Sequence, residues 1–181
     1  MRCSFCLYGV LVCTLLAGGA AMQSSPQSPT VEPASYTLRR YYDGTKDIVL
    51  RAAEKMPEQH YGFKPTEDVR TFGQLVAHVA GANFNLCSIL KGERNPLPEP
   101  NLEKVKKTKS EMVESLKSSY AYCDPIFAAL KDAELGEPRM MFGTPANKAV
   151  LATQLFTHLN KHYGNMITYM RMKGVVPPSS E

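Results

Sequence analysis

Four stretches of the chain carry apolar side chains at spacings of three and four residues, and proline-containing segments separate them. This spacing places the apolar side chains of each stretch on one face of an α-helix. The predicted helices cover residues 35–56, 71–90, 102–131 and 144–173. No segment shows a sustained alternation of polar and apolar residues, so the sequence predicts no sheet. The pattern therefore indicates an all-α fold, a four-helix bundle over residues 35–179.

Residues at the expected helix ends support these boundaries. Thr71 and Gln74 have the spacing of a capping box, in which two side chains satisfy backbone donors at a helix start. Thr144 followed by Pro145 has the pattern of an N-cap with proline in the first helical position. Pro125 falls inside the third predicted helix, and we expect the helix to kink or restart there.

The N-terminal segment is typical of a secretory signal peptide. Arg2 precedes an apolar run over residues 3–17, and small residues continue to Ala21, where we expect cleavage. Residues 22–34 are rich in Ser, Pro and Gln and predict a disordered linker. The alternative is an N-terminal membrane anchor that is never cleaved. No second segment approaches the roughly 18 apolar residues of a membrane-spanning helix, so we expect an exported, periplasmic or secreted, protein without stable membrane insertion.

Two cysteines, Cys87 and Cys123, remain after removal of the predicted signal peptide. In an oxidising compartment they could form a disulfide. The other reading is two buried thiols on separate helices, and the sequence alone leaves both alternatives open.

Three histidines lie on the apolar faces of two predicted helices. His158 and His162 are four residues apart, so their side chains project from the same helix face within reach of one metal ion. His78 lies in the apolar stripe of the second helix. A four-helix bundle could bring the three imidazoles together around one divalent metal ion. The alternative is that each is a hydrogen-bonded core histidine and that the spacing is coincidental.

The two histidine-bearing helices, residues 71–90 and 147–174, contain no Asp or Glu. A carboxylate-bridged di-iron centre, which needs Glu-x-x-His motifs facing inward, is therefore not expected. Three neutral imidazoles leave coordination positions open, as in a reactive zinc-type site. Tyr163, Asn160 and Tyr42 are the nearest polar candidates by helical position, although packing roles are favoured for all three. The catalytic residues therefore stay unknown at this stage.

Three sequence segments carry a resemblance to a known family. They are Phe72-Gly-Gln-Leu-Val-Ala-His78-Val-Ala, His158-Leu-Asn-Lys-His162-Tyr-Gly and Tyr169-Met-Arg-Met-Lys-Gly-Val-Val-Pro-Pro178. With these segments the chain resembles the DinB-like superfamily of four-helix-bundle metalloproteins over roughly residues 36–179. The resemblance implies a divalent metal, zinc or nickel, held by His78, His158 and His162, and often a homodimer. It also implies kinship with transferases and isomerases that use low-molecular-weight thiols.

Two functions fit these expectations. The first is an exported enzyme, a metal-dependent transferase or hydrolase acting on a small molecule through an open metal position. The second is a non-catalytic bundle that the metal stabilises or that captures a small ligand. Nucleic-acid binding is not expected, because the net charge is only +4. The lysines of residues 104–109 lie among Glu103, Glu111 and Glu114, a mixture of charges typical of a solvated helix face.

Overall fold

The computed structural model describes residues 32–181. The predicted signal peptide and residues 22–31 of the predicted linker lie outside the described residues. Within the described part, no helix combines the length and the apolar character needed to cross a bilayer.

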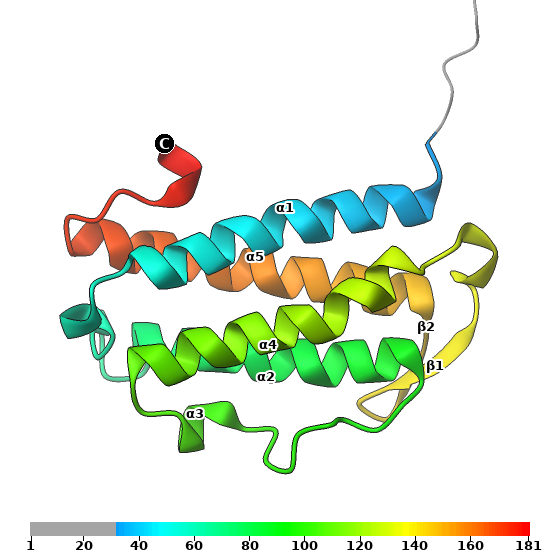
Figure 1. The fold of residues 1–181 in the computed structure, drawn as a ribbon, viewed down its shortest axis with the longest axis horizontal. Coiled ribbons are helices and arrows are strands. Elements are labelled where there is room, and N and C mark those ends of the chain that lie inside the picture. Colours follow the sequence, from blue (N-terminus) through cyan, green and yellow to red (C-terminus); the bar gives the residue numbers. More distant parts are fainter. Residues whose placement is uncertain (1–31) are drawn as a thin grey trace, which may run out of the picture. The chain divides into compact units, whose positions relative to one another are not determined.

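Four long helices form the bundle, as the periodicity predicted (Figure 1). They are α1 (Ala34–Lys55), α2 (Phe72–Lys91), α4 (Lys109–Ala128) and α5 (Lys148–Met172). Helix α2 packs against both α4 and α5, and α1 packs against α5 and α4. Most of the α2 side chains are buried, which agrees with its apolar composition. The mostly helical fold class is thereby confirmed.

Local side-chain chemistry sets where the helices begin. The capping box at the start of α2 is confirmed, because Gln74 N donates to Thr71 Oγ1 at 3.1 Å and Thr71 N donates to Gln74 Oε1 at 2.8 Å. Thr108 and Glu111 form a second capping box at the start of α4. Each box satisfies backbone donors that a helix start leaves without partners, so both helices have well-defined first turns.

The third predicted helix is divided in two. A short helix, α3 (Leu102–Val105), ends at Lys106, whose backbone is extended. The capping box at Thr108 then starts α4, so the prediction of one helix from Leu102 is wrong. The helix also does not restart at Pro125, because α4 continues to Ala128. Pro125 lies in the last turn of α4, so only a few helical residues follow the point at which proline disturbs the helix.

A two-stranded hairpin replaces the loop expected before the last helix. Strands β1 (Pro138–Met141) and β2 (Thr144–Asn147) pair in antiparallel fashion. The expectation of no sheet is therefore wrong for this segment, and so is the N-cap at Thr144. Asn147 is the N-cap of α5, and its side chain accepts a hydrogen bond from Val150 N at 2.9 Å.

A disulfide joins α2 to α4. Cys87 and Cys123 are fully buried, and their Cα atoms are 5.5 Å apart. Of the two alternatives that the sequence left open, the structure has the disulfide. The core also contains stacked aromatic rings, with Tyr42 and Phe127 centroids 4.1 Å apart.

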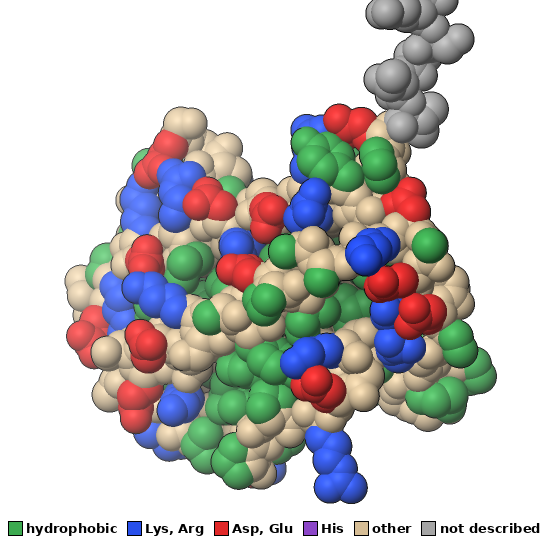
Figure 2. All heavy atoms as spheres, turned by 45° about the vertical axis from the view of Figure 1, so that its right-hand side comes forward, with side chains coloured by type: hydrophobic (Ala, Val, Ile, Leu, Met, Phe, Trp, Pro, Cys, Tyr) green, Lys and Arg blue, Asp and Glu red, His purple; other side chains and the backbone are tan. Residues whose placement is uncertain are grey.

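The outer surface mixes charges of both signs. Figure 2 shows one face on which Lys and Arg side chains alternate with Asp and Glu side chains around an apolar area. On this face no region of a single charge sign stands out.

Candidate metal centre

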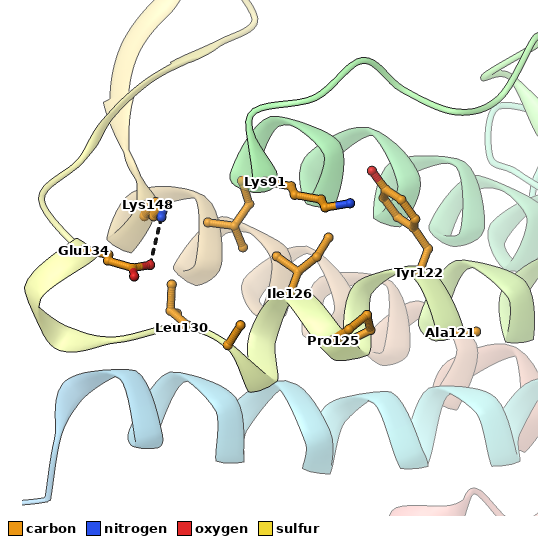
Figure 3. Close-up of a pocket in the computed structure, with 10 residues that line it drawn as sticks. Lys91, Ala121, Tyr122, Pro125, Ile126, Leu130, Glu134 and Lys148 are labelled. Carbon is orange, nitrogen blue, oxygen red and sulfur yellow. Dashed lines mark hydrogen bonds and ion pairs between the residues drawn. The ribbon is translucent and has the colours of Figure 1, made fainter.

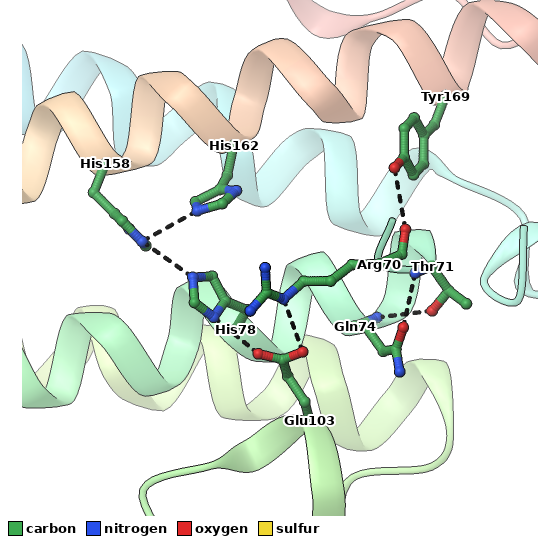
Figure 4. A network of polar contacts seen from close by, with 8 residues as sticks. All are labelled: Arg70, Thr71, Gln74, His78, Glu103, His158, His162 and Tyr169. Atoms are coloured by element: carbon green, nitrogen blue, oxygen red, sulfur yellow. Dashed lines mark hydrogen bonds and ion pairs between the residues drawn. The ribbon is translucent and has the colours of Figure 1, made fainter. Parts of the chain in front are cut away.

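The three predicted histidines meet between α2 and α5 (Figure 4). His78 comes from α2, and His158 and His162 come from successive turns of α5. His158 Nε2 lies 3.2 Å from His78 Nε2 and 3.1 Å from His162 Nε2. One ligand atom from each residue lies within 4.8 Å of the other two. The packing of α2 against α5 thus brings together three imidazoles from three helical turns.

The donor set suits a divalent ion. Two nitrogens that each lie 2.0–2.1 Å from a tetrahedral metal are about 3.3 Å apart, close to the observed separations. Three ring nitrogens at this spacing bring their lone pairs together, and a cation between them could accept all three. The cluster could therefore hold a metal ion.

Burial keeps the imidazoles in the form that binds metals. Burial, and after it the neighbouring imidazoles and Lys161, together lower the pKa of His158 to about 4 and the pKa of His162 to about 3. The pKa of His78 is also lowered, mainly by burial and then by the positive charge of Arg70. Neutral imidazole is the ligating species, so at neutral pH no proton has to be displaced from the ligand atoms.

Glu103 is a carboxylate beside the cluster that sequence reasoning missed. Its Oε1 lies 2.9 Å from His78 Nδ1, and its side chain is only 18% exposed. An ionised carboxylate can only accept, so Nδ1 of His78 carries the proton and Nε2 presents its lone pair to the cluster. The interpretation of Glu103 as part of a solvated face is therefore wrong. The histidine helices do lack carboxylates, but α3 supplies one.

Arg70 connects Glu103 to the rest of the bundle. Its Nε donates to Glu103 Oε2 at 2.8 Å, and its backbone carbonyl accepts a hydrogen bond from the Tyr169 hydroxyl at 3.1 Å (Figure 4). Arg70 directly precedes the capping residue Thr71, so the start of α2 fixes its position. The chain from Tyr169 through Arg70 and Glu103 orients the His78 ring.

The other two histidines lack such support. Among the described residues, Nδ1 of His158 and Nδ1 of His162 are buried and have no hydrogen-bond partner. Their orientation depends on packing within α5. Only His78 therefore has the carboxylate partner that often fixes a metal-binding histidine.

The three polar residues considered from helical position are engaged elsewhere. Tyr42 donates its hydroxyl hydrogen to Asp124 at 2.8 Å. The Tyr163 hydroxyl accepts from the backbone of Ser179, and Asn160 donates to Thr45. Packing and structural hydrogen bonds account for all three.

Two cavities give access to the cluster. His78 and His158 line one of about 440 Å³, and His162 lines another of about 620 Å³ together with Lys161. Arg70 and Glu103 line both cavities. A small molecule could therefore approach the histidines from either side.

A third cavity, of about 350 Å³, lies away from the histidines (Figure 3). Its walls are mainly apolar, with Ile126 and Leu130 among them, and its ion pair between Lys148 and Glu134 is structural. In the described part of the chain, the cluster of potential metal ligands is the histidine trio. The candidate site is therefore the histidine cluster and not this cavity.

Comparison with known proteins agrees with the fold. A model of the DinB superfamily matches residues 41–166, which include all three histidines. The chain belongs to the DinB superfamily. A sequence comparison with curated proteins gives no match.

Solved structures with the DinB fold resemble this DinB protein at low sequence identity. A DinB-like protein from Bacillus cereus is 17% identical, with a TM-score of 0.68, and the match covers 79% of this chain and 95% of that one. A DinB-like protein from Bacillus subtilis is 20% identical, with a TM-score of 0.61 and coverages of 76% and 92%. A variant of the mycothiol-dependent maleylpyruvate isomerase is 14% identical, with a TM-score of 0.57 and coverages of 74% and 59%. At these identities the likeness shows the fold.

Proposed function

We propose that this DinB protein is an exported metalloprotein that binds one divalent ion, zinc or nickel, through His78, His158 and His162. The observation that carries the proposal is the convergence of their Nε2 atoms, with neighbouring atoms 3.1 and 3.2 Å apart. The lowered pKa values of all three imidazoles support it, because they keep the ligand atoms free of protons near neutral pH.

We propose further that the site serves a metal-dependent transferase or hydrolase reaction on a small molecule. When bound, the ion would supply Lewis acidity and would lower the pKa of a coordinated water or thiol. Three protein ligands leave room for such a group, and the two cavities lead to it. One structural neighbour is a mycothiol-dependent isomerase, which is consistent with small-molecule chemistry on this fold.

The residues around the cluster have separate tasks in this proposal. Glu103 holds the Nδ1 proton of His78 and so directs Nε2 toward the ion. Arg70 holds Glu103 in place. The cavity at His162 has both charge signs in its wall, with Lys64, Arg70 and Lys161 beside Glu67, Asp68 and Glu103.

A second candidate function is a metal-stabilised bundle without catalysis. The three histidines would join α2 to α5, as the disulfide joins α2 to α4. In that case the ion chiefly raises stability by mass action. Removal of the metal then lowers the melting temperature strongly, and no turnover depends on the metal.

Metal analysis of purified protein tests the site. We expect one divalent ion per chain in the unaltered protein and loss of that ion in His158→Ala and His162→Ala. His60→Ala removes a histidine outside the cluster and should keep the ion. Equal metal content in all four proteins would contradict the proposal.

Turnover of an activated ester, such as p-nitrophenyl acetate, separates the two candidate functions. Under the enzyme proposal, complete metal removal by a chelator abolishes hydrolysis and readdition of zinc restores it. Hydrolysis that survives complete metal removal would rule out the metal-dependent mechanism. Under the stabilised-bundle alternative, only the melting temperature responds to the chelator.

A reporter fusion tests export. Residues 1–31 fused to alkaline phosphatase, which becomes active only after export, should give phosphatase activity in bacterial cells. The same fusion without residues 1–21 is the control and should be inactive. An inactive full fusion would contradict export.

A further inference from the structure

The tip of the hairpin holds a phenylalanine in an unfavourable backbone conformation. Phe142 has φ of 51° and Gly143 has φ of 82°, and the two residues connect the paired Met141 and Thr144. Two-residue hairpin turns with positive φ at both positions strongly prefer Asn, Asp or Gly at the first. A bulky residue there is strained, and strain of this kind tends to accumulate at functional sites.

Burial does not compensate for this conformation. The Phe142 side chain is 69% exposed, so it gains little from packing against the rest of the bundle. A smaller residue at this position would therefore stabilise the fold at least as well as the exposed and strained phenylalanine does.

Phe142 instead lines the cavity that leads to the metal centre. This cavity, of about 440 Å³, has His78 and His158 in its wall together with Leu86 of α2. Leu86 lies eight residues after His78, and a rise of 1.5 Å per residue makes their separation along the helix about 12 Å. The cavity therefore follows more than two turns of α2 beyond His78.

The opposite wall of the cavity comes from the segment before α3. A Cβ atom on Gly81 would lie only 2.6 Å from the Pro100 carbonyl oxygen, so glycine permits the close approach of this segment to α2. Leu102 is buried beside it and lines the cavity. The cavity wall is therefore mainly apolar, although Asn85, Asn101 and Gln154 also line it.

Hydrogen bonds hold the hairpin in this place. Arg139 Nε donates to the Leu90 carbonyl at the end of α2 at 3.3 Å. Glu137 precedes β1 and Lys148 follows β2. Lys148 N donates to the Glu137 carbonyl at 3.1 Å, and Lys148 Nζ pairs with the Glu137 carboxylate at 2.9 Å. The base of the hairpin is therefore fixed to both α2 and α5.

We propose that Phe142 is a specificity-determining residue that contacts the apolar part of an amphiphilic small molecule. One end of that molecule is a metal-binding group at the histidine cluster, and its apolar chain or ring follows α2 toward the hairpin. The inference rests on the proposed function, because it assigns the substrate class of the same site. Exposure, strain and position in the cavity all follow from one role, which is contact with a bound ligand.

Two hydroxamates that share a metal-binding head test this proposal. Their binding to zinc-loaded protein is measured by titration calorimetry, with acetohydroxamate as the short probe and octanohydroxamate as the long one. In the unaltered protein we expect octanohydroxamate to bind at least about tenfold more tightly, because burial of several methylene groups favours it. In Phe142→Asn this preference should fall about five- to tenfold, while acetohydroxamate affinity stays the same.

The melting temperature of the same variants separates a binding role from a structural one. Phe142→Asn should melt at the same or a higher temperature, because Asn suits the turn. Met140→Thr alters an exposed residue of the same hairpin that does not line the cavity, and it should leave both affinities unchanged. A lower melting temperature of Phe142→Asn with unchanged chain-length preference would overturn the inference.

The two levels of the proposal fail in different ways. If both hydroxamates bind the zinc-loaded protein equally and Phe142→Asn changes neither affinity, the inference about Phe142 is wrong and the metal site stands. If neither hydroxamate binds, the histidines do not present an accessible ion, and the proposed function is wrong together with the inference.

Discussion

The disulfide between α2 and α4 should contribute a large part of the stability of the bundle. Cys87 and Cys123 are 36 residues apart in the sequence. Closing a loop of this length in the unfolded chain costs entropy, and the chain-entropy relation gives about 4 kcal/mol at 25 °C. Single domains are stable by only about 5–15 kcal/mol, so reduction should remove a large share of the total.

Urea denaturation of the metal-free protein with and without a phosphine reductant measures this contribution. Reduction leaves the sequence unchanged and alters the side-chain volume only slightly, so the comparison isolates the contribution of the disulfide bond to stability. With a denaturant slope of about 2 kcal/mol per molar urea, the midpoint should fall by about 2 M on reduction.

The double variant Cys87→Ala/Cys123→Ala is the control, and its midpoint should not respond to the reductant. Coincident midpoints for the oxidised and reduced natural sequence would refute the reasoning. Two titratable thiols in the unfolded, unreduced protein would refute it more directly, because the disulfide would then be absent.

Three further predictions concern the metal centre and its surroundings. Glu103→Gln should weaken zinc binding about ten- to hundredfold, because His78 loses its charged partner. Competition with a chromophoric chelator measures this affinity, and the control Glu93→Gln, at an exposed position, should leave it unchanged. The pKa of His162 is lowered to about 3 in the folded protein, so its contribution to the stability of the metal-free fold is complete above pH 6.5 and is lost as pH falls toward 3. Melting temperatures measured across this pH range should show the loss, and a flat profile would contradict it. Gly81→Ala should lower both stability and zinc affinity, because its Cβ would lie 2.6 Å from the Pro100 carbonyl oxygen. The control Gly164→Ala, on the exposed face of α5, should stabilise the protein by about 0.5–1 kcal/mol in the same urea assay.

The histidines could be found from the sequence because helix periodicity is a local property. His158 and His162 are one turn apart on α5, so their shared face follows from helix geometry alone. His78 occupies an inward position that the apolar pattern of α2 indicates. Their meeting required only that two amphipathic helices pack against each other.

Glu103 could not be found in this way because its role depends on tertiary packing. In the sequence it belongs to a segment rich in Lys and Glu, which is typical of a solvated helix. The structure ends that helix after Val105 and places α3 against α2, where Gly81 leaves space for the preceding segment. The one available sequence signal was this glycine in the middle of an otherwise well-formed helix.

The hairpin was missed because its strands are only four residues long. Pro138–Met141 and Thr144–Asn147 are too short to display an alternation, and Thr144 with Pro145 matches the start of a helix equally well. The turn itself contradicts local preference, because Phe142 occupies a position that favours Asn or Gly. A local rule fails here at the residue to which we assign ligand recognition.

X-ray absorption spectroscopy of the zinc-loaded protein tests the central claim most directly. The three-histidine site predicts three imidazole nitrogens at about 2.0–2.1 Å from zinc and a fourth light-atom ligand. In His78→Ala the imidazole contribution should fall to two or the metal should be lost. A spectrum dominated by sulfur, or one that is unchanged in His78→Ala, would contradict a metal centre shared by α2 and α5.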